Sequence, residues 1–64
     1  MNEPMAFTEL EQVYDLLAET IDKVGEKNES LFLSKLALTL AHELGDLEQV
    51  REAVRIAAKG LAEP

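Results

Sequence analysis

The single histidine of this 64-residue chain, His42, is its only candidate general base near neutral pH. Nucleophilic catalysis would also need a hydroxyl within reach of the imidazole and an acid to orient it. Thr39 precedes His42 by about one helical turn, but a threonine hydroxyl inside a helix usually bonds the carbonyl three or four residues earlier. We therefore predict that His42 lies at a surface or an interface. We expect no catalytic residue, and a protein that is not an enzyme.

Metal chemistry also lacks ligands in the required pattern. Residues 41–45 contain one His–Glu pair, but the second histidine of a zinc-protease motif is missing. Helical di-metal sites need carboxylates that project inward from several helices, usually with a Glu three residues before a His. The carboxylates of residues 9–22 instead lie on the outer face of their predicted helix. The sequence contains no cysteine, which excludes thiolate ligands. We predict no metal and no cofactor.

The charge balance excludes further classes of partner. Six basic side chains stand against thirteen acidic ones, and the net charge is −7 with an isoelectric point near 4.4. Nucleic acids and anionic membranes both require clustered Lys and Arg, so neither is expected as a partner. No apolar run approaches the ~20 residues of a membrane span. Residues 1–7 lack the cationic and apolar regions of a secretory signal, and we expect a cytoplasmic protein.

Apolar spacing predicts a single domain, residues 1–64, with three helices at about 9–24, 29–44 and 47–59. Thr8 and Glu11 form a capping box at the start of the first helix, and Gly25 ends it. Its carboxylates share one face. The opposite face carries an apolar stripe of Leu10, Val13, Tyr14, Leu17, Ile21 and Val24.

The boundaries of the second and third helices are marked by polar residues and glycine. Either Asn28 or Ser30 caps the second helix, and Gly45 ends it. Asp46 then caps the third helix, with Gln49 as the second member of a box-like pair. Because the link has only two residues, these two helices are expected to form a close hairpin.

The second helix is too apolar for a chain of this length to cover. One broad face carries Leu33, Leu36, Ala37, Leu40, Ala41 and Leu44. A helix that is apolar around more than half of its circumference needs neighbours on several sides. A chain of this size buries only about 60% of its unfolded surface, and small scaffolds without disulfides or metals usually depend on oligomerisation. We therefore predict self-association through this helix.

Several apolar residues lie away from the main stripes. A scattered exposed leucine is normal, but several aligned on one surface form an interaction patch. Leu31 and Leu38, seven residues apart, widen the apolar face of the second helix on one side, and Phe32 lies beyond its other edge. The predicted interface residues are Leu31, Phe32, Leu38, Leu16 and Ile56.

The order of these segments resembles a known family. Val13-Tyr14-Asp15-Leu16-Leu17 places a tyrosine near the start of an acidic first helix. A Leu/Ala-rich second helix ends in residues 38–46, LTLAHELGD, and a short helix with Val50 and Ala53 follows. Over residues 9–58 the chain is similar to short bacterial proteins grouped as domain-of-unknown-function family 2783. The resemblance implies a small bacterial helical protein without an assigned activity, and draws attention to Tyr14 and His42.

Together these observations predict an all-α chain of three short helices that assembles as a homodimeric helical bundle. The expected function is that of a small non-enzymatic interaction or accessory protein. The alternative is a regulatory or stabilising subunit of a larger bacterial enzyme, which would make another protein the partner. Behaviour in isolation separates the two, because a stable homo-oligomer favours the first hypothesis and a poorly behaved monomer rescued by another protein favours the second.

Overall fold

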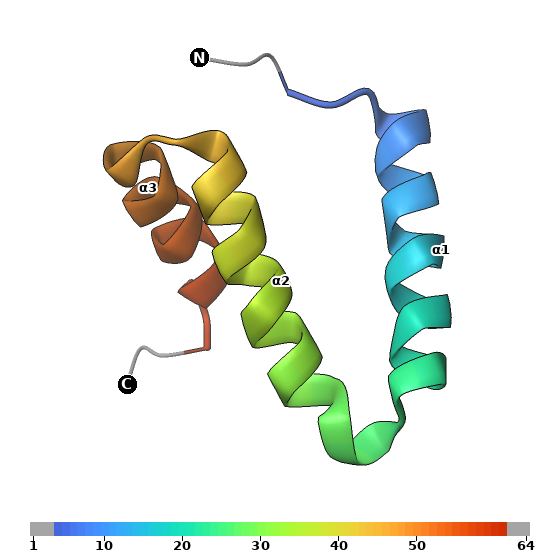
Figure 1. Cartoon of the computed structure of the whole chain (residues 1–64). Helices are drawn as coiled ribbons and strands as arrows, with labels where there is room; N and C mark the ends of the chain where they lie inside the picture. Colours follow the sequence, from blue (N-terminus) through green and yellow to red (C-terminus); the bar gives the residue numbers. More distant parts are fainter. Residues whose placement is uncertain (1–3, 62–64) are drawn as a thin grey trace. The chain divides into compact units, whose positions relative to one another are not determined.

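A computed structural model describes residues 4–61 and shows an all-α chain (Figure 1). The helices are α1 (Phe7–Val24), the short 3₁₀ helix η1 (Glu26–Asn28), α2 (Glu29–Leu44) and α3 (Leu47–Ala58). No strand occurs within the described range. The all-α prediction with three α-helices is therefore confirmed. The chain divides into two compact units, the first ending at Leu33 and the second beginning at Ser34, and each is described by itself.

In the first unit, α1 begins earlier than the sequence indicated. Ala6 is the last extended residue, with φ −60° and ψ 146°. Its carbonyl accepts hydrogen bonds from the amides of Glu9 and Leu10, both at 3.0 Å. The predicted capping box of Thr8 and Glu11 is wrong, because a capping residue needs extended backbone and Thr8 lies inside the first helical turn. No side chain caps this helix start.

The end of α1 is closed by Gly25 and by a side chain. Gly25 has φ 89°, and its amide donates to the carbonyl of Ile21 at 3.0 Å. Asn28 Nδ2 donates to the carbonyl of Val24, also at 3.0 Å. The expectation that Asn28 or Ser30 caps α2 therefore needs correction. Asn28 satisfies an acceptor at the end of α1, and Ser30 lies inside α2.

In the second unit, the link between α2 and α3 forms as the sequence predicted. Gly45 has φ 73°, and its amide donates to the carbonyl of Ala41 at 3.0 Å. Asp46 is extended, and its Oδ1 accepts from the amides of Glu48 at 2.9 Å and Gln49 at 3.2 Å. Gln49 Nε2 donates to Asp46 Oδ2 at 3.2 Å. The cap is confirmed, although the Gln49 side chain bonds the carboxylate of Asp46 rather than its backbone amide.

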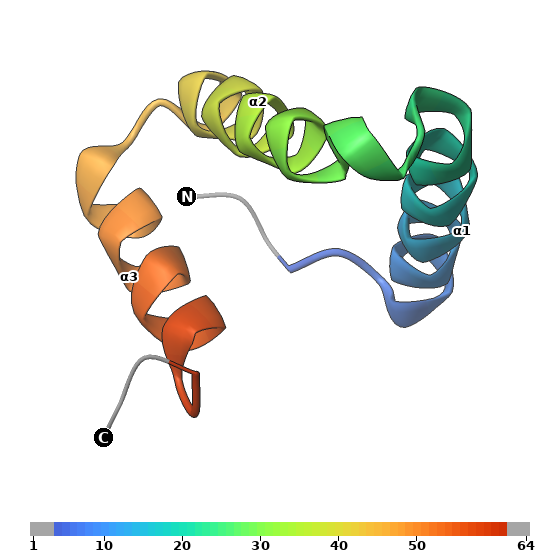
Figure 2. The ribbon, with the colours of Figure 1, turned by 90° about the horizontal axis from the view of Figure 1, so that it is seen from below.

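The close hairpin of α2 and α3 is not formed. Within residues 34–61, no Cα atom of α2 lies within 8 Å of a Cα atom of α3. Gly45 is left-handed and Asp46 is extended, so that the link runs on as a short extended segment before α3 begins (Figure 2). A two-residue link can therefore join two helices without packing them against each other.

None of the residues from 4 to 61 is buried in the single chain. Of the predicted apolar stripe on α1, Leu10 and Tyr14 are 51% and 72% exposed. The other members of that stripe are half-buried: Val13, Leu17, Ile21 and Val24. The amphipathic helices have formed, but their apolar faces remain open to solvent.

The left-handed backbone at Gly45 leads to a stability prediction. A Cβ atom at this position would meet no heavy atom within 4 Å, so that any penalty for a side chain comes from its backbone. We expect Gly45→Val to destabilise the fold by about 1 kcal/mol or more, because β-branched residues disfavour positive φ. Thermal unfolding followed by circular dichroism measures the effect. Gly45→Asn is the matched control and should cost less, since Asn tolerates this conformation. An unchanged melting temperature for Gly45→Val would contradict the assignment.

Candidate functional site

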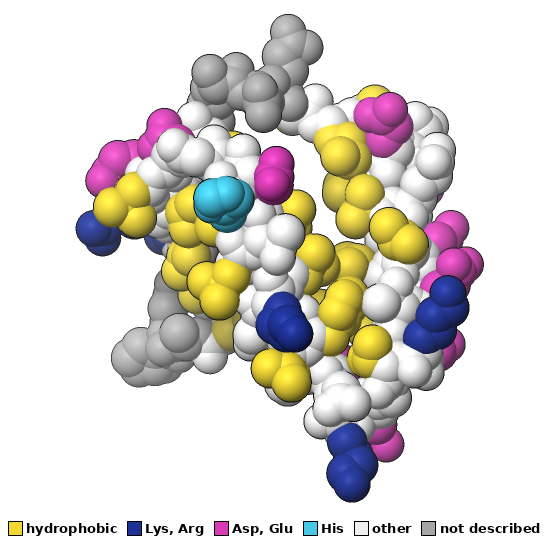
Figure 3. Space-filling view, in the orientation of Figure 1, with side chains coloured by type: hydrophobic (Ala, Val, Ile, Leu, Met, Phe, Trp, Pro, Cys, Tyr) yellow, Lys and Arg dark blue, Asp and Glu magenta, His cyan; other side chains and the backbone are white. Residues whose placement is uncertain are grey.

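His42 lies near the end of α2 with its side chain exposed, drawn in cyan in Figure 3. The Thr39 hydroxyl donates to the carbonyl of Lys35 at 2.8 Å, as predicted for a threonine inside a helix. Within residues 4–61, no side chain forms a hydrogen bond with His42. The geometry therefore does not assemble a base, a hydroxyl and an orienting acid.

The charged side chains pair locally along α3. Arg51 Nε lies 3.4 Å from Glu48 Oε2, and Arg55 Nε donates to Glu52 Oε1 at 3.1 Å. Arg55 Nη2 also bonds Glu52 Oε2, which makes the second pair bidentate. This guanidinium lowers the pKa of the Glu52 carboxyl, and the carboxylate raises the pKa of Arg55. Over the described residues, no group of three or more His, Cys, Asp and Glu side chains is arranged to hold a metal ion.

Tyr14, which the family resemblance singled out, stands on the surface of α1. It lines a shallow depression with Phe7 and Leu10, and the carboxylates Glu11 and Asp15 border it. All five residues belong to α1 and form two rows from Phe7, one through Leu10 and Tyr14 and the other through Glu11 and Asp15. No second element of the first unit closes this depression, so that it offers no enclosed site for a small molecule.

The predicted interface residues have been left largely accessible. Leu31 and Leu38 are 59% and 72% exposed, two turns apart on α2. Leu16 and Ile56 are 61% and 60% exposed on α1 and α3. Phe32 is half-buried. Their accessibility permits an interface, and their role in one stays a prediction.

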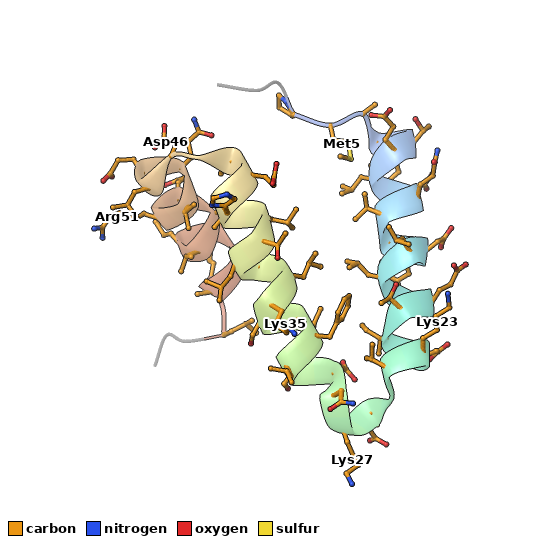
Figure 4. All side chains as sticks on the ribbon, in the orientation of Figure 1. Met5, Lys23, Lys27, Lys35, Asp46 and Arg51 are labelled. Atoms are coloured by element: carbon orange, nitrogen blue, oxygen red, sulfur yellow. The ribbon has the colours of Figure 1, made fainter. Side chains whose placement is uncertain are left out.

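The second unit also contains an apolar groove of about 300 Å³ between α2 and α3. No charged residue lines it. In Figure 4, Arg51 points away from α2, consistent with a charged face of α3 on the side opposite the groove. Leu40 and Val54 in the groove are 58% and 60% exposed. The lining residues are Ala37, Leu40, Ala41, Leu44, Val50, Ala53, Val54 and Ala57.

The sequence predicts the four lining residues of α2 on one apolar face and a close hairpin of α2 with α3, but not a groove between them. The groove exists because the two helices stand apart, which periodicity cannot show. A signal was present in the alanines at four-residue spacing, Ala37 with Ala41 and Ala53 with Ala57, because small side chains leave room beside a helix.

No helix within residues 4–61 is both long and apolar enough to cross a bilayer. Comparison of the chain with protein-family models, curated proteins and solved structures finds no match. The function must therefore be inferred from the groove, the exposed apolar residues and the arrangement of charges.

The exposed position of His42 predicts a silent substitution. We expect His42→Gln to change the free energy of unfolding by less than about 1 kcal/mol, as for most surface changes. Urea unfolding of both proteins measures this, and zinc titration by calorimetry serves as the second readout. Stoichiometric zinc binding at micromolar affinity that disappears in His42→Gln would contradict the prediction that the chain binds no metal.

The bidentate pair on α3 predicts a pH dependence. A carboxyl with a lowered pKa in the folded chain contributes stability above its unfolded pKa, and that contribution is lost as the pH falls through the folded value. Carbon-13 NMR titration should therefore show Glu52 protonating below the ordinary value of 4.5. Arg55→Gln should return the titration midpoint of Glu52 toward that value. An identical midpoint in both proteins would show that the pair does not persist in solution.

Proposed function

We propose that this chain is a small non-enzymatic helical protein that acts by association, and that it forms a homodimer through the apolar face of α2. The observation that supports the proposal is the absence of any buried residue between residues 4 and 61 of the single chain. Both units contribute exposed large apolar side chains: Met5, Phe7, Leu10, Tyr14, Leu16, Leu31, Leu33, Leu38, Leu40, Leu44, Leu47, Val54, Ile56 and Leu61.

The free energy of folding explains why such a surface favours a partner. Ordering a backbone costs roughly 1–2 kcal/mol per residue, and burial of apolar side chains must offset that cost. Fully burying one leucine contributes about 1.5–3 kcal/mol. Because the single chain buries none of its leucines fully, a second copy is the simplest source of the missing burial.

The chemistry of the remaining residues supports a role without catalysis. His42 and Thr39 are not arranged as a catalytic pair, and the charged residues of α3 pair with one another. The resemblance to domain-of-unknown-function family 2783 fits a small bacterial accessory protein. The acidic, cysteine-free sequence fits a cytoplasmic one.

A subunit role in a larger bacterial enzyme is the second candidate. The apolar groove of the second unit favours it, because an amphipathic helix of another protein could occupy such a groove. Affinity capture at native abundance, followed by reconstitution with the purified candidate partner, tests this role. A chain that is poorly folded alone and gains helicity only with that partner would favour the second candidate over the homodimer.

Self-association predicts that a charge on α2 disrupts the assembly. We expect wild-type protein to sediment as a dimer at tens of micromolar. Leu38→Glu should yield a monomer, or an unfolded chain if folding and association are coupled, because an unpaired charge is costly to bury. Leu61→Glu is the matched control at an exposed site after α3, and it should remain a dimer. Sedimentation equilibrium measures all three. A wild-type protein that is a stable monomer would overturn the homodimer.

A further inference from the structure

We infer that the groove between α2 and α3 binds the α2–α3 segment of a second copy, with each helix antiparallel to its own counterpart. This inference rests on the proposed self-association and names the surface and the orientation that it uses. It also adds the groove-lining residues of α3 to the interface, of which the sequence predicted only Ile56 on this helix.

The groove is uncharged and its lining alternates in size. On α2 the lining residues are Ala37, Leu40, Ala41 and Leu44. On α3 they are Val50, Ala53, Val54 and Ala57. Each helix therefore presents two large and two small side chains at the spacing of one helical face. Packing of two helices is best when large side chains of one enter the spaces above small side chains of the other.

An antiparallel copy meets this requirement on α2. A two-fold axis that crosses α2 between Leu40 and Ala41 relates residues at equal distances on either side of that point. Leu40 of one copy then faces Ala41 of the other, and Leu44 faces Ala37. A parallel, in-register copy instead places Leu40 against Leu40 and alanine against alanine, which crowds one level and leaves the next one empty.

The same relation holds on α3. If the axis that crosses α2 also passes between Ala53 and Val54 of α3, Val54 of one copy faces Ala53 of the other, and Val50 faces Ala57. Each large lining side chain on both helices thus faces an alanine. Such a surface is self-complementary, as an interface between two identical chains requires.

The distribution of charge favours this part of the chain as the contact between two copies. Residues 1–33 contain eight acidic and two basic side chains, whereas residues 34–64 contain five and four. Residues 34–64, which contain the groove, therefore have a net charge of only −1, out of −7 for the whole chain. Two acidic chains that meet through this part bring little like charge together, since most of the carboxylates lie in residues 1–33.

A charge at the centre of the groove tests the inference. Ala53→Glu retains helix propensity and is located on α3, outside the apolar face of α2. We expect it to weaken the dimer at least about 100-fold in sedimentation equilibrium, because the symmetric interface buries two unpaired carboxylates. Ala18→Glu makes the same change at an exposed position of α1 and should leave the dimer intact.

The outcomes separate this inference from the proposed function. If wild-type protein is a monomer, both fail. If wild-type and Ala53→Glu are equally stable dimers while Leu38→Glu dissociates, α2 mediates association and the groove inference is overturned. If Ala53→Glu loses the dimer and Ala18→Glu keeps it, the groove inference is supported, provided that Ala53→Glu retains its helical circular dichroism.

A measurement on unmodified protein covers the case in which Ala53→Glu fails to fold. Isotope-filtered NMR on a mixture of methyl-labelled and unlabelled wild-type chains detects contacts between copies only. We expect intermolecular cross-peaks from Leu44 methyls to Ala37, and from Val50 methyls to Ala57. If the protein sediments as a dimer and these groove methyls give no intermolecular cross-peaks, the inference is overturned. Leu40-to-Leu40 cross-peaks without the Leu44-to-Ala37 contact would overturn the antiparallel orientation.

Discussion

Uncovered apolar surface is the constraint on which the rest of this structure depends. Each helix satisfies its own backbone and most of its ends: Gly25 and Asn28 close α1, and Gly45 with Asp46 links α2 to α3. Hydrogen bonding is therefore largely complete within short stretches of sequence. Hydrophobic burial is not, because no residue from 4 to 61 is buried in one chain. Local order without a core leaves the apolar faces of the described residues open to solvent in the single chain.

Several polar side chains also interact only within their own helices. Thr39 bonds the backbone of its own helix, and the ion pairs of α3 join residues three apart. Such exposed pairs add little stability. The groove between α2 and α3 differs from these ion pairs, because it is a concave surface lined only by apolar side chains. Apolar packing is the kind of contact that the lining of this groove offers.

The helices and several of their ends could be predicted from the sequence, because the signals are local. Glycine after a leucine-rich run marks the end of α2 because it tolerates positive φ, and Asp46 marks the start of α3 because its side-chain oxygen accepts from the first amides of that helix. The capping box predicted at Thr8 was wrong because a Thr-x-x-Glu sequence can also lie inside a helix. Here the helix starts two residues earlier, at Ala6, which has no side-chain cap. The prediction for Asn28 was wrong because an asparagine side chain has both a donor and an acceptor. Its oxygen can accept from a following amide as a helix cap, but here its NH₂ group donates to the preceding carbonyl of Val24. The spaced alanines of α2 and α3 indicate room beside each helix, but the groove also depends on the separation of the two helices, which periodicity does not record.

The short sequence range of the contacts has a kinetic consequence. Within each unit, no two described residues twelve or more apart in sequence have Cα atoms within 8 Å. Chains dominated by such local contacts fold fast, and isolated helices form in about a microsecond. Under the proposed assembly, the slow step is the encounter of two chains, whose rate rises with their concentration. The concentration of the chain then sets the fraction that is assembled.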